Sequence, residues 1–124
     1  MTVRGVTSFT STTGARSVVV EATGELDTTS VAAFREALEA AVRADLPLVV
    51  VDLGRVTFLD SAGLSVVFGV QRTMPPPQRL VLGNVPQRML RTLRLAGVVA
   101  VVEVHPQGEP QPWRDADPAS DADS

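Results

Sequence analysis

The chain has 124 residues, enough for one domain with a hydrophobic core of ordinary size. It contains no Cys, which excludes disulfides, thiolate metal sites and a thiol nucleophile; all eleven basic residues are Arg, which excludes a P-loop or Schiff-base lysine. Residues 1–104 carry a net charge of +1 and residues 105–124 a net charge of −4, so the near-neutral body lacks the basic footprint of a nucleic-acid-binding protein.

Membrane, metal and cofactor functions also find little support. The longest apolar runs have the length of a strand and are too short to span a bilayer, and the first residues lack the apolar segment of a secretory leader. There is no cluster of metal-ligating residues. We therefore expect a cytoplasmic protein with no membrane contact, no metal and no cofactor.

The first half of the chain predicts two strands and a helix. Residues 3–9 alternate weakly and are followed by a turn at 11–14, and the β-branched run 17–23 predicts a second strand. An apolar stripe with helical spacing then covers residues 31–42. Asp27, Thr28 or Thr29 is expected to cap this helix.

The second half continues the alternation. The apolar run 48–52 is continuous, which predicts a central strand covered on both faces, and a helix is expected from Ser61 to Met74. A strand at 79–83, a helix from Pro86 to Gly97 and a last strand at 98–104 complete the pattern.

The predicted order ββαβαβαβ indicates an α/β fold with a mixed, mostly parallel sheet of about five strands and three or more helices. Residues 1–104 form the predicted domain. Residues 105–124 are rich in Pro, Asp and Ala, and we expect a disordered acidic tail there.

Ser61 lies where the central strand gives way to the second helix. A serine at this position is usually an N-cap, whose hydroxyl accepts a hydrogen bond from a free backbone N–H. The same free N–H groups and the helix dipole would also favour a phosphate. Both interpretations remain open from the residues alone.

Two motifs resemble one family. The segments 23–27 (Thr-Gly-Glu-Leu-Asp) and 58–64 (Phe-Leu-Asp-Ser-Ala-Gly-Leu) are similar to the STAS domain of bacterial anti-sigma factor antagonists, and the segment 95–98 is similar to the end of that family's third long helix. The resemblance covers residues 3–104 and implies a STAS-like fold. It departs from the family at Ala62, where Ser or Thr is frequent, and this removes a competing hydroxyl.

The resemblance implies a non-enzymatic regulator. Such a protein binds an anti-sigma factor that is also a serine kinase, and the binding releases a sigma factor for transcription. The kinase reverses this by phosphorylating the antagonist, here at Ser61, and a PP2C-type phosphatase resets it. We expect the partner to contact Asp27, Thr28, Asp60, Ala62, Gly63 and Leu64.

Three parts of that surface have specific expectations. Asp27 and Thr28 should lie beside Ser61, because the carboxyl ends of parallel strands share one edge of a sheet. Asp60 either holds its loop through backbone hydrogen bonds or positions kinase and acceptor. Because Gly63 has no side chain, a kinase cleft could approach the backbone there.

Two other functions remain as alternatives. The domain could be a STAS adaptor or ligand sensor in a signalling or transport assembly that is never phosphorylated. An enzyme with Ser61 as nucleophile would need a nearby base, and the only histidine is the distant His105.

Two further features have both a structural and a partner-binding interpretation. Arg88, Arg91 and Arg94 form either a solvated helix face or a docking site for an acidic partner. Trp113 is either disordered within the tail or a short docking element.

Overall fold

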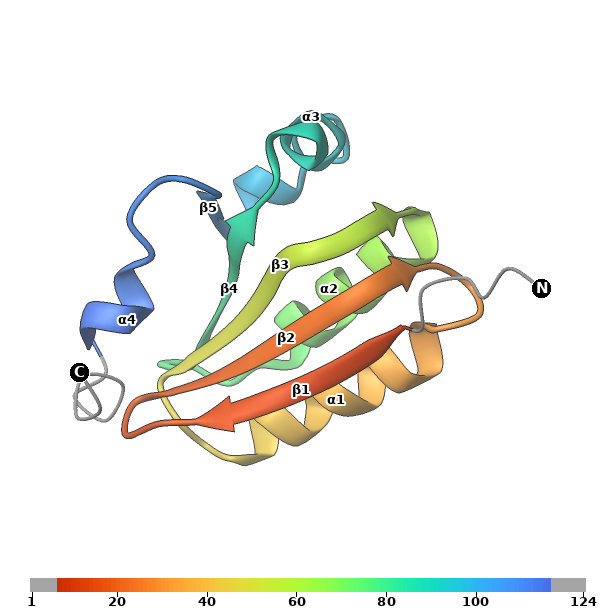
Figure 1. Cartoon of the computed structure of the whole chain (residues 1–124). Coiled ribbons are helices and arrows are strands. Elements are labelled where there is room, and N and C mark those ends of the chain that lie inside the picture. The colour runs from red at the N-terminus through yellow and green to blue at the C-terminus, as the bar shows by residue number, and fades with distance from the viewer. Residues whose placement is uncertain (1–6, 117–124) are drawn as a thin grey trace.

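A single five-stranded sheet organises the chain (Figure 1), and the computed structural model describes residues 7–116. The sheet order is β1-β2-β3-β4-β5, with β1 antiparallel to β2 and every other neighbouring pair parallel. The strands are β1 (Ser8–Thr13), β2 (Ser17–Leu26), β3 (Leu48–Leu59), β4 (Arg79–Val85) and β5 (Glu103–Pro106). The helical elements are α1 (Val31–Arg43), α2 (Ser61–Thr73), α3 (Gln87–Leu95), the 3-10 turn η1 (Val98–Ala100) and α4 (Pro112–Ala116). The predicted α/β fold with a mixed, mostly parallel sheet is confirmed.

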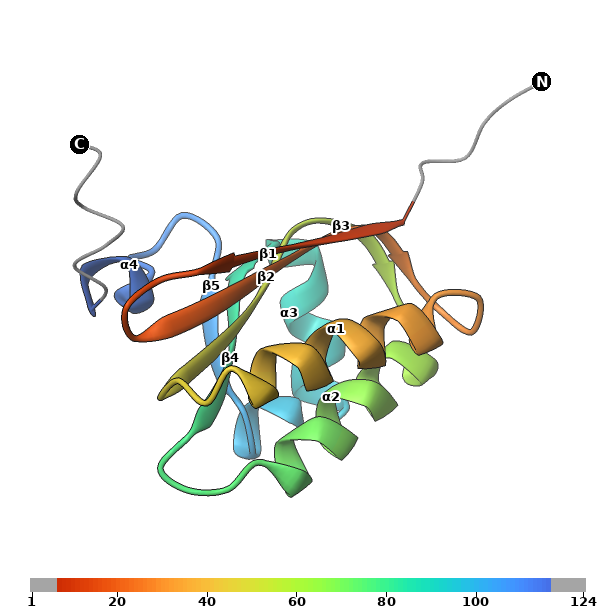
Figure 2. The same cartoon turned by 90° about the horizontal axis from the view of Figure 1, so that it is seen from below.

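Helices α1 and α2 cover the same face of the sheet (Figure 2). Strands β2, β3 and β4 follow one another both in sequence and in the sheet, and right-handed crossovers in one direction place their helices on one side. Phe34 and Leu38 of α1 are fully buried there, and Phe9 of β1 stacks on Phe34 with ring centroids 5.6 Å apart. Among the described residues no long helix covers the opposite sheet face, which is called the open face below.

Strand β3 shows why its apolar run is continuous. Val49 and Val51 point into the main core under the helices, whereas Leu48 and Val50 belong to a second, smaller cluster on the open face. The expectation of a central strand covered on both sides is therefore correct. The cover on the open face is the indole of Trp113, which is only 4% exposed.

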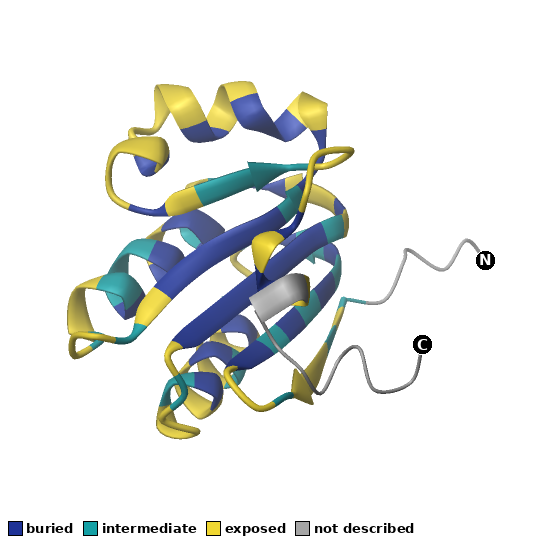
Figure 3. Cartoon of the chain, turned by 90° about the vertical axis from the view of Figure 1, so that its left-hand side faces the viewer, coloured by how far each residue is buried: buried dark blue, intermediate teal, exposed yellow. Residues whose placement is uncertain are grey.

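The expected disordered tail from residue 105 is wrong for residues 105–116. Strand β5 runs to Pro106, and α4 then lies over the open face (Figure 3). The Trp113 ring rests on Gly83, where an added Cβ would lie 2.0 Å from the ring atom Cη2. Burying one large aromatic ring outweighs the polar composition of the segment around it. Residues 117–124 lie outside the described residues.

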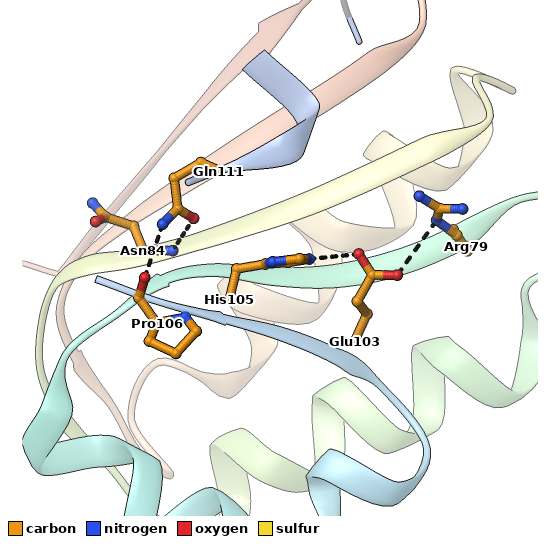
Figure 4. Close-up of polar contacts among 6 residues, drawn as sticks. All are labelled: Arg79, Asn84, Glu103, His105, Pro106 and Gln111. Atoms are coloured by element: carbon orange, nitrogen blue, oxygen red, sulfur yellow. Dashed lines mark hydrogen bonds and ion pairs between the residues drawn. The ribbon is translucent and has the colours of Figure 1, made fainter. Parts of the chain in front are cut away.

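The side chain of Gln111 fixes this segment to the sheet (Figure 4). Its Oε1 accepts from the backbone N–H of Asn84 (2.8 Å), and its Nε2 donates to the carbonyl oxygens of Pro106 (2.9 Å) and Glu109 (2.7 Å). A buried amide with both ends satisfied specifies one geometry. The C-terminal segment is thus part of the domain.

The strand boundaries also differ from the prediction, because β2, β3 and β4 run on to Leu26, Leu59 and Val85 and the first and last strands lie elsewhere. The first strand was expected at residues 3–9 but covers Ser8–Thr13; residues 3–6 lie outside the described residues. The last strand was expected at 98–104, but Gly97 at φ 79° turns the chain into η1 and only residues 103–106 pair with β4. Val98 and Val102 are buried beneath this turn, so their apolar character reflects packing and not strand pairing.

Candidate phosphoacceptor and partner-binding site

The loops that follow β2 and β3 lie side by side at one edge of the sheet. Leu26 and Leu59, the last residues of the two strands, are paired in register. The backbone N–H of Asp60 donates to the carbonyl oxygen of Leu26 across the gap, at 3.2 Å. The structure therefore brings the Asp27 loop next to the start of α2, as two adjacent parallel strands require.

Asp60, and not Ser61, is the N-cap of α2. The Asp60 carboxylate accepts hydrogen bonds from the N–H groups of Ala62 (2.9 Å) and Gly63 (3.3 Å). The interpretation of Ser61 as the capping residue is thus wrong. Aspartate is an equally good cap, and its negative charge also suits the helix dipole.

Ser61 is the first residue of α2 and is exposed. Its hydroxyl makes no hydrogen bond within residues 7–116, whereas its carbonyl oxygen accepts from the Ser65 hydroxyl at 2.8 Å. Ala62 is half-buried beside it. An accessible, unengaged hydroxyl on a fixed backbone is the chemistry that a kinase acceptor needs.

Gly63 and Leu64 face inward. A Cβ at Gly63 would lie 2.6 Å from Leu59 Cδ1 and 2.9 Å from the carbonyl oxygen of Leu26. Glycine is therefore required so that α2 can approach the end of β2, which replaces the interpretation that it admits a kinase cleft. The Leu64 side chain belongs to the main core, so neither residue offers an outward side chain to a partner.

The Asp27 loop is held by its own side chains. Asp27 Oδ1 accepts from the backbone N–H (2.9 Å) and the hydroxyl (2.6 Å) of Thr29. The Ser30 hydroxyl accepts from the Asp27 N–H (3.1 Å) and donates to the Glu25 carbonyl oxygen (2.7 Å). Ser30 occupies the N-cap position of α1 without a side-chain cap, so the expected capping by Asp27, Thr28 or Thr29 is wrong.

The electrostatics of this edge are acidic. The hydrogen bonds from the Thr29 hydroxyl, followed by that from the Thr29 N–H, hold the pKa of Asp27 below its ordinary value of 3.8. Asp27 therefore stays ionised at neutral pH, and its loop lies next to Asp60 and Ser61 at the start of α2. Thr28 is the exposed residue after Asp27 and adds a hydroxyl to this loop.

Phe58 is the member of this surface that sequence reasoning left without a role. It is 49% exposed and pairs in register with Glu25 on β2. Strand alternation could have indicated this exposure. Leu59 points into the core, and the residue before it in a strand points to the other face. An exposed aromatic next to a partner-binding edge is a typical anchor in protein interfaces.

Within residues 7–116, no histidine lies beside Ser61 to act as a base, and no cluster of metal ligands forms there. His105 lies on β5, where its Nε2 contacts Glu103 and its ring packs edge-on against Trp113. No group of three His, Cys, Asp or Glu side chains comes together in the described part of the chain. The described helices also include none that is long and apolar enough to cross a bilayer.

Comparison with known proteins gives the family. Residues 9–103 match the family described as Mlab, STAS domain, and the chain belongs to this family. No curated protein matches the chain in sequence.

Solved structures share the fold. An anti-sigma factor antagonist from Mycobacterium paratuberculosis superposes with a TM-score of 0.76 at 23% identity, covering 82% of this chain and 86% of that one. Unphosphorylated SpoIIAA, an anti-sigma factor antagonist, gives 0.64 at 20% identity, covering 88% and 94%. The phosphorylated form of SpoIIAA from Bacillus gives 0.60 at 24% identity, covering 78% and 90%.

Proposed function

We propose that the chain is an anti-sigma factor antagonist that binds an anti-sigma factor with serine-kinase activity and thereby releases a sigma factor. Phosphorylation of Ser61 by that kinase ends the interaction, and a PP2C-type phosphatase restores it. The observation that carries the proposal is the exposed, unengaged Ser61 hydroxyl beside an Asp60 carboxylate that already caps the helix. The antagonists of the same fold named above add support at the level of the fold.

The switch acts on the surface and leaves the fold in place. Asp60 satisfies the first N–H groups of α2 by itself, so the helix start depends on neither the Ser61 hydroxyl nor a phosphate. SpoIIAA matches this chain in both its unphosphorylated and its phosphorylated form, with TM-scores of 0.64 and 0.60. A conserved scaffold under a changing charge fits that pair of similarities.

The change in charge is large enough to control binding. A phosphate adds about −1.5 to −2 charges at neutral pH. It would join Asp27 and Asp60 on an edge that is already acidic, and burying it in an interface without a cationic partner costs several kcal/mol. About 3 kcal/mol corresponds to more than a hundredfold in affinity.

The test uses the intact chain and a serine-kinase anti-sigma factor encoded in the same genome. Ser61→Ala should bind the kinase without being phosphorylated, and Ser61→Asp should bind at least about tenfold more weakly. Ser65→Ala is the matched control, because Ser65 is an exposed serine one turn later in α2. Phosphate incorporation that persists in Ser61→Ala would contradict the assignment.

A second candidate is a STAS adaptor that is never phosphorylated. The family description names Mlab and not a sigma-factor regulator, and this observation favours an adaptor role in another assembly. The two functions are separated by mass spectrometry after incubation with candidate kinases and ATP. An intact mass that never changes would favour the adaptor.

A further inference from the structure

Three exposed aliphatic side chains lie at the end of α3 and in the turn that follows. Leu95 is 78% exposed, Val101 is 51% exposed and Val99 is 47% exposed. Together with Phe58 they are the large hydrophobic side chains most exposed in the described part of the chain. We call Leu95, Val99 and Val101 the distal strip. Single exposed aliphatics are ordinary, but three within seven residues form a surface feature.

A cavity opens directly beside this strip. Val101 lines it together with the apolar side chains of Met74 and Leu80, and its volume is about 340 Å³. Such a volume lies at the lower end of the range for ligand pockets and is large enough for an apolar side chain of a partner. The exposed side chains of the strip and the adjacent cavity together resemble a helix-binding groove.

The cations near the strip outnumber the acids. Helix α3 carries three Arg and no acidic residue. Arg88 is engaged, since its Nη2 donates to the Val56 carbonyl oxygen at 2.6 Å. Arg91 and Arg94 are exposed and have no acidic partner within residues 7–116.

The wall of the cavity holds one cation and one acid. Arg79 lines it and lies 3.8 Å from its one acidic neighbour there, Glu103, with both side chains largely open to water. An exposed ion pair of this length contributes little, so Arg79 can turn to another acid at small cost. The excess positive charge beside the distal strip therefore comes from Arg91 and Arg94.

The cavity beside the distal strip is lined by Arg79, which lies at the end of the sheet opposite the Ser61 edge. Arg79 starts β4 and pairs with Leu48, the first residue of β3, whereas Ser61 follows the last residue of β3. Twelve residues of strand separate the two ends, which is about 36 Å at roughly 3.3 Å per residue. The cavity end of the distal strip therefore lies at the opposite end of β3 from Ser61.

We propose that the distal strip is a second docking surface, which binds an acidic amphipathic helix of a partner protein irrespective of the phosphorylation state of Ser61. The apolar face of such a helix would cover Leu95, Val99 and Val101, and its acidic side chains would pair with Arg91, Arg94 and Arg79. A second copy of the chain fits less well, because a two-fold contact would set the arginines of α3 against each other.

The experiment titrates the full chain with two synthetic amphipathic helices of about 18 residues that share a leucine face. One has Glu on its polar face and the other has Lys. Fluorescence anisotropy should give binding of the Glu peptide at least about tenfold tighter than that of the Lys peptide at low ionic strength. The double variant Arg91→Glu/Arg94→Glu should weaken the Glu peptide by about tenfold or more, and Leu95→Ser/Val101→Ser by a similar factor.

Arg35→Glu/Arg43→Glu on α1 is the matched control, because it changes the net charge equally on another exposed helix face. It should change the affinity by less than about threefold. Ser61→Asp should leave the affinity unchanged. Equal binding of both peptides, equal effects of the two charge reversals, loss of binding in Ser61→Asp, or tighter binding to anionic vesicles than to the Glu peptide would each overturn the proposal.

Discussion

Two adjacent residues divide the work that a single serine was expected to do. Asp60 closes the start of α2 through the N–H groups of Ala62 and Gly63, and Ser61 presents a hydroxyl that holds nothing in place. This separation matters for a switch, because the modified group can change without a change in helix stability.

Replacing each of the two residues by alanine tests this separation. Asp60→Ala should lower the free energy of unfolding by about 1 kcal/mol, the usual cost of removing a cap. Ser61→Ala should change it by less than about 0.5 kcal/mol, as for an ordinary surface position. Urea denaturation followed by circular dichroism measures both values, and an equal loss in the two variants would mean that Ser61 also caps the helix.

Gly63 and Gly69 offer a matched pair within one helix. Gly63→Ala should destabilise the domain by about 1–3 kcal/mol, because its Cβ would clash with the Leu26 carbonyl oxygen and the Leu59 side chain. Gly69 has nothing within 4 Å of an added Cβ, so Gly69→Ala should stabilise α2 by up to about 1 kcal/mol. Thermal unfolding of both variants should therefore shift in opposite directions.

The pKa of Asp27 is set by its loop. Thr29→Val removes the hydroxyl that donates to Asp27 Oδ1, so the pKa of Asp27 should rise toward its ordinary value of 3.8. The sign for stability follows from the lowered pKa: the hydrogen bonds stabilise the loop above the unfolded pKa and are lost as the pH falls through the folded one. Carboxyl NMR titration of wild type and Thr29→Val measures the difference, and identical curves would exclude this cause.

At the scale of elements, local patterns predicted most of the fold. The β-branched run of β2, the continuous run of β3 and the helical stripe of α1 each follow from short-range periodicity. All three elements begin where expected, but β2 and β3 run past their predicted ends to Leu26 and Leu59. The β1 boundary could not be placed, because its Ser and Thr residues become a strand only through pairing with β2.

The site shows the same limit. The motif and the parallel-strand rule placed Asp27 beside Ser61, but no local pattern shows which of Asp60 and Ser61 caps the helix. The burial of Gly63 depends on the approach of Leu26, which lies 37 positions earlier in the sequence. Contacts between distant segments were therefore the part that sequence reasoning could not supply.

The C-terminal segment is the clearest example and gives a test. In Gly83→Ala the new Cβ would displace the Trp113 ring without changing the apolar residues beneath it. Since Trp113 is the only tryptophan, its fluorescence should move to longer wavelength as the ring meets water. Gly69→Ala serves as the control with unchanged emission, and an unshifted spectrum in Gly83→Ala would show that the ring stays seated.

At the scale of the whole molecule, the Ser61 edge and the distal strip differ in charge. Asp27 and Asp60 follow the carboxyl ends of β2 and β3 beside Ser61, whereas Arg91 and Arg94 lie on α3 and Arg79 starts β4. A scaffold of this kind can hold one partner while phosphorylation decides whether a second one binds.

The packing of Trp113 on the sheet also determines where the protein can be truncated. A clone cut to the family match would stop at residue 103 and would remove both Gln111 and the indole. This truncation would expose a contiguous hydrophobic patch of Leu48, Val50 and Val81 to solvent. The shortened protein should therefore aggregate on purification. An affinity tag on the C-terminal side should follow residue 116, so that α4 and Trp113 remain packed on the open face.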